Sequence, residues 1–311
     1  MNRYFEIVAR VAPIFFLLGA GYFFKRKKLV AADTVSGMKT FVARVTLPPV
    51  VFMAFSAVKI DYTAGLTAIA VFSACVIALV IGRALERMRH GDGMRPYLMT
   101  AFEGSMLGFP LFAVLYGQAA VPFIAMADIG EIIFTFTVLI PILDARSGGG
   151  KPNLKTFVHR LYTNPVIWAV VLGLVTAVTG FSDLLAGSRE GELLFAGLAF
   201  LAAPTGGIVL FVVGYDLDFS RASLREAVPT VLLRYMLVAI LFVAAWAFIS
   251  MLSPRTDPLL KSALLVLFMM PSSFAITIFG KPGEDSRMVA TTLSLNTLVT
   301  VFLLGILMAF S

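Results

Sequence analysis

The amino-acid sequence predicts an all-α integral membrane protein, and three observations carry that prediction. Hydrophobic residues make up 59% of the 311 residues, charged residues make up only 14%, and the mean hydropathy is +0.92. A soluble globular domain carries roughly 25% charged residues, so nearly all of this chain is expected to lie in the bilayer. Ten apolar stretches are long enough to cross it, and two of them contain a proline-centred interruption.

The apolar stretches follow one another with short polar connections. Each has about the 17–25 residues that a membrane-spanning helix needs. The first has no small-residue cleavage site before its basic end, so we expect a retained helix and not a signal peptide. In order, the stretches cover residues 7–24, 36–57, 63–81, 96–116, 121–143, 162–180, 192–215, 228–252, 258–279 and 286–310.

The longest connection, 144–161, divides the ten spans into two groups of five. An odd number of spans in each group forces the second group to enter the membrane from the opposite side. The sequence therefore predicts two repeats of inverted topology, residues 1–161 and 162–311.

Prolines lie at matching places in the two groups. Pro48 in span two lies 156 residues before Pro204 in span seven. Pro110 in span four lies 161 residues before Pro271 in span nine. A near-constant offset is what a duplicated unit leaves behind, so these positions support the predicted repeat, although proline is common in membrane helices.

Basic residues report the orientation of the chain. Sixteen Lys and Arg residues follow the odd-numbered spans, whereas six lie on the other side. Cytoplasmic loops carry the excess of Lys and Arg. We therefore place the connections that follow the odd-numbered spans in the cytoplasm, and both termini outside it. The net charge of +7 is explained in this way, and no nucleic-acid partner is expected.

Several function classes are excluded by what the sequence lacks. The single cysteine, Cys75, cannot form an internal disulfide, and with only His90 and His159 beside it no zinc site is expected. No phosphate-binding Gly-Lys-Ser/Thr loop occurs, so ATP is not expected to drive the protein directly. Asp216 lacks the second aspartate in a Gly-x-Gly-Asp context that an intramembrane protease needs. We therefore expect no enzyme and no cofactor.

The fourth and ninth spans are interrupted in their middle, at residues 103–110 and 269–273. A broken helix leaves backbone N–H and C=O groups unpaired, which is tolerated only where the backbone is buried in protein or lines a polar cavity. Two breaks in corresponding spans are the best sequence indication of a substrate site at the midplane of a secondary transporter.

The breaks suggest how an anion would be held. Proline fits the first turn of a helix, so Pro110 and Pro271 are each expected to begin a half-helix with a partial positive charge at its N-terminus. Two such ends meeting near the midplane would stabilise an anion without a buried Lys or Arg. Alternatively, the prolines only kink the helices for packing. The candidate substrate-binding residues are Ser105, Gly108, Pro110, Pro271, Ser272 and Ser273.

Ionisable residues inside the spans form a second group of candidates, because burying them in the bilayer is costly. Asp128 and Glu131 are three residues apart and share one face of span five. Two close carboxylates in a low dielectric should hold one proton between them, which makes a proton carrier. Alternatively, they form a structural ion pair with Arg234. The candidates for ion or proton coupling are Glu103, Asp128, Glu131, Asn296 and Arg234.

A set of short motifs resembles those of the auxin efflux carrier family. The motifs occur in the same order and are spread over essentially the whole chain. Where that family often shows Gly-Asn before the glycine-proline of span four, this chain has Gly104-Ser105. The motifs are Leu47-Pro48-Pro49, Gly108-Phe109-Pro110, Thr163-Asn164-Pro165, Met270-Pro271-Ser272-Ser273 and residues 290–297.

The resemblance implies ten helices in two inverted repeats, similar to plant PIN transporters, and kinship of fold with bile-acid symporters and sodium/proton antiporters. It implies that helices four and nine cross at their breaks. Spans one, two, six and seven would form a scaffold, which is often dimeric. The other six spans would form a moving transport domain. Bacterial members look like carriers of small carboxylates such as malonate or malate, which implies a multi-pass protein of the bacterial inner membrane.

We therefore expect a secondary active transporter of a small organic anion, working by elevator-type alternating access as a homodimer in the lipid bilayer. The residues leave open the substrate, the direction, and coupling to H⁺ or Na⁺. The main alternative is a cation/proton antiporter, because the fold and the acids would serve one too. A membrane sensor would carry an appended signalling domain, and none is expected.

The predicted orientation can be tested with single cysteines in a Cys75→Ala background. Gly149→Cys, in the connection between the two halves, should react with an impermeant thiol reagent only after the membrane is opened. Gly187→Cys, in a connection predicted to lie outside, should react in intact cells. The reverse labelling pattern would contradict the orientation.

Overall fold

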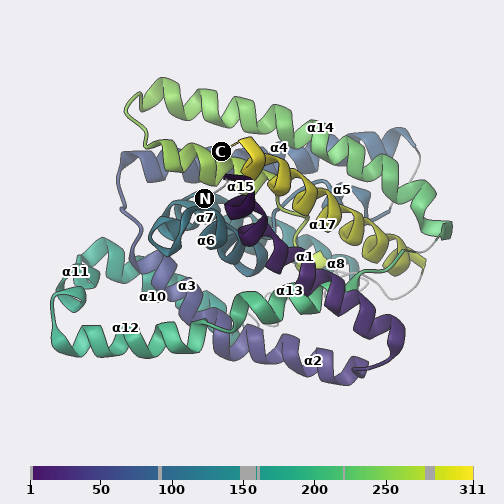
Figure 1. The fold of residues 1–311 in the computed structure, drawn as a ribbon. Helices are drawn as coiled ribbons and strands as arrows, with labels where there is room; N and C mark the ends of the chain where they lie inside the picture. Colours follow the sequence, from purple (N-terminus) through teal and green to yellow (C-terminus); the bar gives the residue numbers. More distant parts are fainter. Residues whose placement is uncertain are drawn as a thin grey trace. The chain divides into compact units, whose positions relative to one another are not determined.

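The computed structural model describes residues 3–89, 93–147, 159, 162–219, 221–276 and 284–310. All regular elements within these ranges are helices (Figure 1), as predicted. The helices of the described part that are long and apolar enough to cross a membrane are the six covering Ala32–Ser56, Tyr62–Met88, Gln118–Arg146, Arg189–Asp216, Ser223–Leu252 and Arg287–Leu307. The all-α membrane class is thus supported, and the ten-helix inverted repeat stays a prediction.

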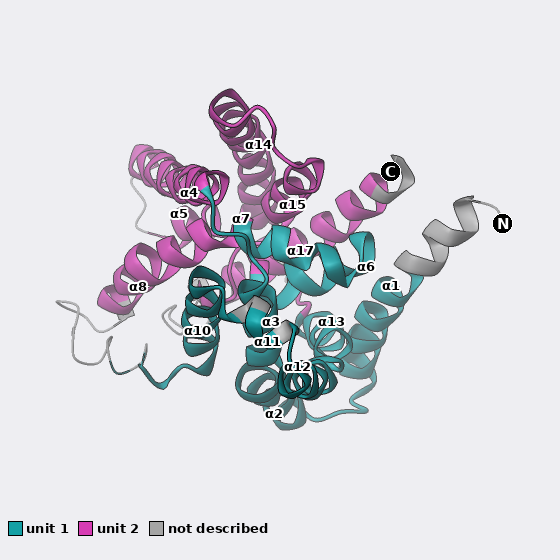
Figure 2. Ribbon diagram, turned by 90° about the vertical axis from the view of Figure 1, so that its left-hand side faces the viewer, with its two compact units in different colours: residues 1–61, 105–126, 155–216 teal, residues 62–104, 127–154, 217–311 magenta. Residues whose placement is uncertain are grey.

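The chain divides into two compact units, coloured separately in Figure 2. Unit 1 comprises residues 1–61, 105–126 and 155–216, and unit 2 comprises residues 62–104, 127–154 and 217–311. Predicted spans one, two, six and seven lie in unit 1, and spans three, eight, nine and ten lie in unit 2. Spans four and five are each divided between the units.

Unit 1 is built on two helix pairs, α1 with α13 and α3 with α10. The α2, η1 and α3 segments join end to end as one helix. The helices are α1 (Arg3–Lys27), α2 (Ala32–Phe41), η1 (Val42–Thr46), α3 (Leu47–Ser56), α6 (Phe109–Tyr116), η3 (Gln118–Ala120), α10 (Pro165–Thr179), α11 (Phe181–Ala186), α12 (Arg189–Ala202) and α13 (Thr205–Asp216).

The sequence sets where α10 begins and ends. The Asn164 side chain accepts a hydrogen bond from the backbone N–H of Val166, and Pro165 occupies the first helical position, where no N–H is needed. The helix ends at Gly180, whose φ of +69° is the left-handed conformation that glycine adopts without strain.

Helices α1 and α13 approach so closely that only glycine fits between them. A Cβ added at Gly21 would lie 2.1 Å from the Phe211 carbonyl oxygen, and one added at Gly214 would lie 2.1 Å from the Leu18 carbonyl oxygen. Small residues at a helix interface let two backbones pack directly, which is how membrane helices associate without a hydrophobic driving force.

In unit 2, the long helix α14 packs against α4, α15 and α17. Helix α7 begins in unit 1 and continues in unit 2, and η2 begins with the last residue of unit 2. The helices are α4 (Tyr62–Met88), α5 (Arg95–Leu98), η2 (Gly104–Gly108), α7 (Val121–Phe134), η4 (Thr135–Leu139), α8 (Ile140–Ser147), α14 (Arg221–Leu252), α15 (Pro258–Met269) and α17 (Glu284–Phe310).

Prolines are accommodated by wide turns in three places. The π-helical turns η1, η2 and η4 end directly before Leu47-Pro48, Phe109-Pro110 and Ile140-Pro141. Proline lacks an N–H, and its ring clashes with the carbonyl four residues earlier. A π turn at that point relieves the clash, so the helix continues through the proline.

This accommodation corrects the predicted role of Pro110. Although Pro110 occupies an early position in α6, the helical segment that contains it runs from Gly104 to Tyr116. The break in span four therefore lies before Gly104, over residues 99–103. In span nine, α15 ends at Met269, and Pro271 lies within the non-helical stretch itself.

The close packing of α1 on α13 predicts a large difference between two neighbouring glycines. Gly21→Ala should lower stability by about 1–3 kcal/mol, because the new methyl group meets backbone that cannot move aside. Gly19→Ala, on the same helix with nothing within 4 Å of the added Cβ, is the matched control. Melting temperatures of the purified proteins measure both, and equal values would contradict the packing.

Candidate functional site: the crossing of the two breaks

The two broken segments meet in unit 2. Residues 99–103 and 270–274 are non-helical, and the backbone N–H of Glu103 donates to the Pro271 carbonyl oxygen at 2.9 Å. Ala101 has a φ of +57°, which residues other than glycine rarely adopt, so the chain turns sharply there. Both predicted spans are interrupted, but the break of span four covers residues 99–103 and not the predicted 103–110. The backbones of the two breaks contact each other.

Arg234 of α14 holds the two breaks together, and its side chain is 0% exposed. Its Nη1 donates to the carbonyl oxygens of Leu98 and Thr100, both at 3.2 Å. Its Nη2 donates to the carbonyls of Ala101 at 2.9 Å and Met270 at 3.2 Å. One guanidinium thereby satisfies carbonyls of both broken segments, which lack helical partners.

The ion pair considered from the sequence is not how Arg234 is held. In the described part of the chain, none of the ion pairs includes Arg234, and its hydrogen bonds all go to backbone carbonyls. Its guanidinium also lies over the Phe102 ring, 5.3 Å from the ring centre, a cation–π contact. Arg234 is therefore a structural tie between the breaks.

Ser272 and Asn296 belong to the same hydrogen-bond network that joins the two breaks. Asn296 Nδ2 donates to Ser272 Oγ at 3.0 Å, and Ser272 Oγ donates in turn to the Leu98 carbonyl. Tyr235, next to Arg234, donates its hydroxyl to the Asn296 carbonyl at 2.9 Å. Ser272, predicted to bind substrate, is thus engaged in holding the breaks. The Asn296 Oδ1 atom is buried and has no hydrogen-bond partner among the described residues.

The Glu103 carboxylate contacts the backbone of the second break. Its Oε2 accepts a hydrogen bond from the backbone N–H of Phe274 at 2.7 Å. Ser273 Oγ accepts from the N–H of Ala275 at 3.4 Å. A hydrogen bond from a backbone N–H to a carboxylate is charge-assisted and stronger than one between neutral groups. One of the two places predicted for a substrate anion is therefore occupied by the chain's own carboxylate.

The other two acids lie against the residues on either side of Glu103. Glu131 Oε1 accepts from Thr135 Oγ1 at 2.6 Å and from the backbone N–H of Phe102 at 3.4 Å. Asp128 is 0% exposed, and its Oδ1 lies 2.1 Å from where a Cβ of Gly104 would be, so only glycine fits there. Two carboxyl groups thus lie against the residues that flank Glu103, while the Glu103 carboxylate itself contacts the second break.

Ser105, Gly108 and Pro110 belong to unit 1, whereas the residues described above belong to unit 2. Pro110 lines an apolar cavity of about 730 Å³ formed with α3, α12 and α13. That volume is in the range of small-molecule sites. Thr205, also in its lining, is 1% exposed, and its hydroxyl has no hydrogen-bond partner in the described part of the chain.

Sequence reasoning missed several members of this site. Thr135 could have been found, because it follows Glu131 at the i, i+4 spacing that places both on one helix face. Tyr235 and Gly104 gave no comparable signal. The carbonyls of residues 98, 100, 101 and 270 could not be found at all, since backbone acceptors have no sequence signature.

Comparison with known families agrees with the motifs noted in the sequence. The family described as membrane transport protein matches residues 6–308, nearly the whole chain. A comparison with curated proteins found no match. Membership favours a multi-pass membrane transporter over an enzyme, in agreement with the apolar helices and the buried crossing. The chain belongs to the membrane transport protein family, which is that of the auxin efflux carriers.

Proposed function

We propose that this protein is a secondary active transporter that moves a small organic anion together with a proton across the bacterial inner membrane. The observation that carries the proposal is the hydrogen bond from the Phe274 N–H to the Glu103 carboxylate. A carboxylate substrate offers the same chemistry as Glu103, so the two would compete for the same N–H group.

Competition of this kind couples anion and proton. When Glu103 is ionised, it accepts from the Phe274 N–H and excludes another anion from that group. When Glu103 takes up a proton, it becomes the weaker acceptor, and the substrate carboxylate can replace it at the Phe274 N–H. The total charge of the crossing is then unchanged. An unaccompanied anion would add charge beside Asp128 and Glu131, and like-charge contacts of this kind cost several kcal/mol.

Unit 2 carries Glu103, Asp128, Glu131 and Arg234 as one body. We infer that it is the moving part and that unit 1 is the scaffold, so that alternating access is a rigid-body movement of unit 2. Glu103 is only half-buried, whereas Asp128 is 0% and Glu131 5% exposed. Of the three acids it is therefore the one best able to exchange a proton with water.

The experiment is proton-driven uptake in proteoliposomes. Glu103→Gln keeps an acceptor for the Phe274 N–H but cannot take up a proton, so accumulation driven by a pH gradient should be lost while anion binding at constant pH survives. Malonate, malate and a set of monocarboxylates serve as substrates, and binding is followed by thermal shift.

Glu190→Gln, an exposed acid in the first turn of α12, is the control and should transport as the wild type does. Asp128→Asn and Glu131→Gln, measured in parallel, show whether the proton resides on one of the buried acids instead. Full proton-driven accumulation by Glu103→Gln would contradict the proposal.

A cation/proton antiporter is the second candidate, and one observation favours it. The buried Asn296 Oδ1 has no hydrogen-bond partner in the described part of the chain, and the crossing also holds three carboxyl groups. Oxygen atoms alone are what hard cations prefer. In this case a Na⁺ gradient should drive proton movement with no organic anion present, and Asp128→Asn should abolish it. Proton movement that requires an anion would exclude the antiporter.

A further inference from the structure

Three arginines of unit 2 surround one polar cavity outside the crossing. Arg89 follows α4, Arg95 begins α5, and Arg225 lies in the first turns of α14. Together with Glu226 they line a space of about 570 Å³. Arginines from three separate elements therefore converge on one place.

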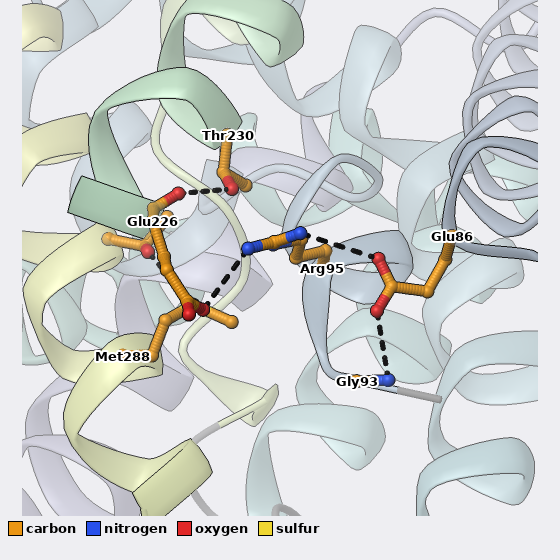
Figure 3. A network of polar contacts seen from close by, with 7 residues as sticks. Glu86, Gly93, Arg95, Glu226, Thr230 and Met288 are labelled. Carbon is orange, nitrogen blue, oxygen red and sulfur yellow. Dashed lines mark hydrogen bonds and ion pairs between the residues drawn. The ribbon is translucent and has the colours of Figure 1, made fainter. Parts of the chain in front are cut away.

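Among the described residues, the ion pairs at this cavity all involve Arg95. Figure 3 shows Arg95 between two carboxylates, with Nη2 at 3.1 Å from Glu226 and Nη1 at 3.9 Å from Glu86. Glu86 is fixed in turn by the Gly93 backbone N–H at 3.1 Å. Arg89 and Arg225 are exposed and have no ion pair within the described part of the chain. Within the described part, no carboxylate therefore engages these two exposed guanidinium groups at the cavity.

An apolar path begins at the same arginines. A second cavity, of about 400 Å³, is also lined by Arg89 and Arg95 and adds the apolar side chains of Met88 and Leu233. Met88 is 77% exposed. From there an exposed stripe continues along α14 at i, i+4 and i+8 spacing, formed by Leu232, Met236 and Ile240.

Arg89 and Arg225 lie at the ends of two helices that are long and apolar enough to cross a membrane, Tyr62–Met88 and Ser223–Leu252. The ends of such helices are where lipid headgroups lie. Positive pockets between helices at the cytoplasmic surface attract anionic headgroups, and each Lys or Arg adds to that attraction. A charged pocket leading into an apolar stripe matches a molecule with an anionic head and a hydrocarbon tail.

We propose that this pocket binds an anionic phospholipid, with its phosphodiester on Arg89 and Arg225 and one acyl chain along the α14 stripe. The guanidinium fork donates two parallel hydrogen bonds to phosphate oxygens. Free phosphate would use the arginines but not the stripe. An acidic peptide fits less well, because the stripe belongs to a helix whose composition places it in the bilayer.

The test measures the melting temperature of the detergent-solubilised protein with added phosphatidylglycerol. Lipid should stabilise the wild type by binding the folded state. In Arg89→Gln/Arg225→Gln the apparent affinity should fall on the order of tenfold or more, from the loss of two phosphate contacts. Arg87→Gln/Arg255→Gln removes the same charge at two exposed positions outside the pocket and should respond as the wild type does.

Each further compound added to the protein distinguishes the proposal from one alternative ligand. An unchanged response of the pocket variant to phosphatidylglycerol overturns the proposal, as does an equal response of the wild type to phosphatidylcholine. Stabilisation by inorganic phosphate at the same concentration would identify a free anion as ligand, and stabilisation by polyglutamate alone would identify an acidic protein. Should the pocket double variant not purify, Arg225→Gln alone, in an exposed position, is judged by the same criteria.

Discussion

The crossing depends on how backbone carbonyls are satisfied where two helices are interrupted. Inside a membrane, an unpaired carbonyl costs about 1–3 kcal/mol or more, since no bulk water replaces the lost hydrogen bond. Arg234 meets this requirement with one side chain, by donating to Leu98, Thr100, Ala101 and Met270. Its positive charge is buried among carbonyl dipoles, so these contacts also compensate for its own loss of hydration.

The same arrangement gives the site its chemistry. Because Arg234 is engaged with carbonyls, it is not the ion-pair partner of the acids, which instead lie along the first break. Glu103 accepts a hydrogen bond from the Phe274 N–H of the second break, while Asp128 and Glu131 contact the residues on either side of Glu103. A charge change on Glu103 or Glu131 alters a hydrogen bond that its carboxylate accepts from the backbone of a break. Proton binding and substrate binding can therefore influence one another there.

The sequence predicted the membrane class, the family and an interruption in each of spans four and nine, because apolar length, proline position and short motifs are local signals. It placed the interruption of span four at residues 103–110, whereas the non-helical residues are 99–103. It did not predict that a π turn lets the helix pass Pro110, since the turn depends on the geometry of residues 104–108. Nor did it predict the role of Arg234, whose bond to Leu98 joins residues 136 apart. Ser272 was expected to face substrate, but its hydroxyl is engaged with Leu98 and Asn296.

Hydrogen–deuterium exchange of Arg234→Lys, compared with the wild type, tests the central role of this arginine most directly. A lysine ammonium keeps the charge but cannot reach four carbonyls, because it lacks the planar fork of five donors. Amide exchange should rise in peptides covering 99–104 and 270–276 and stay unchanged in the α1 and α13 peptides of unit 1. Unchanged exchange at both breaks would contradict the account.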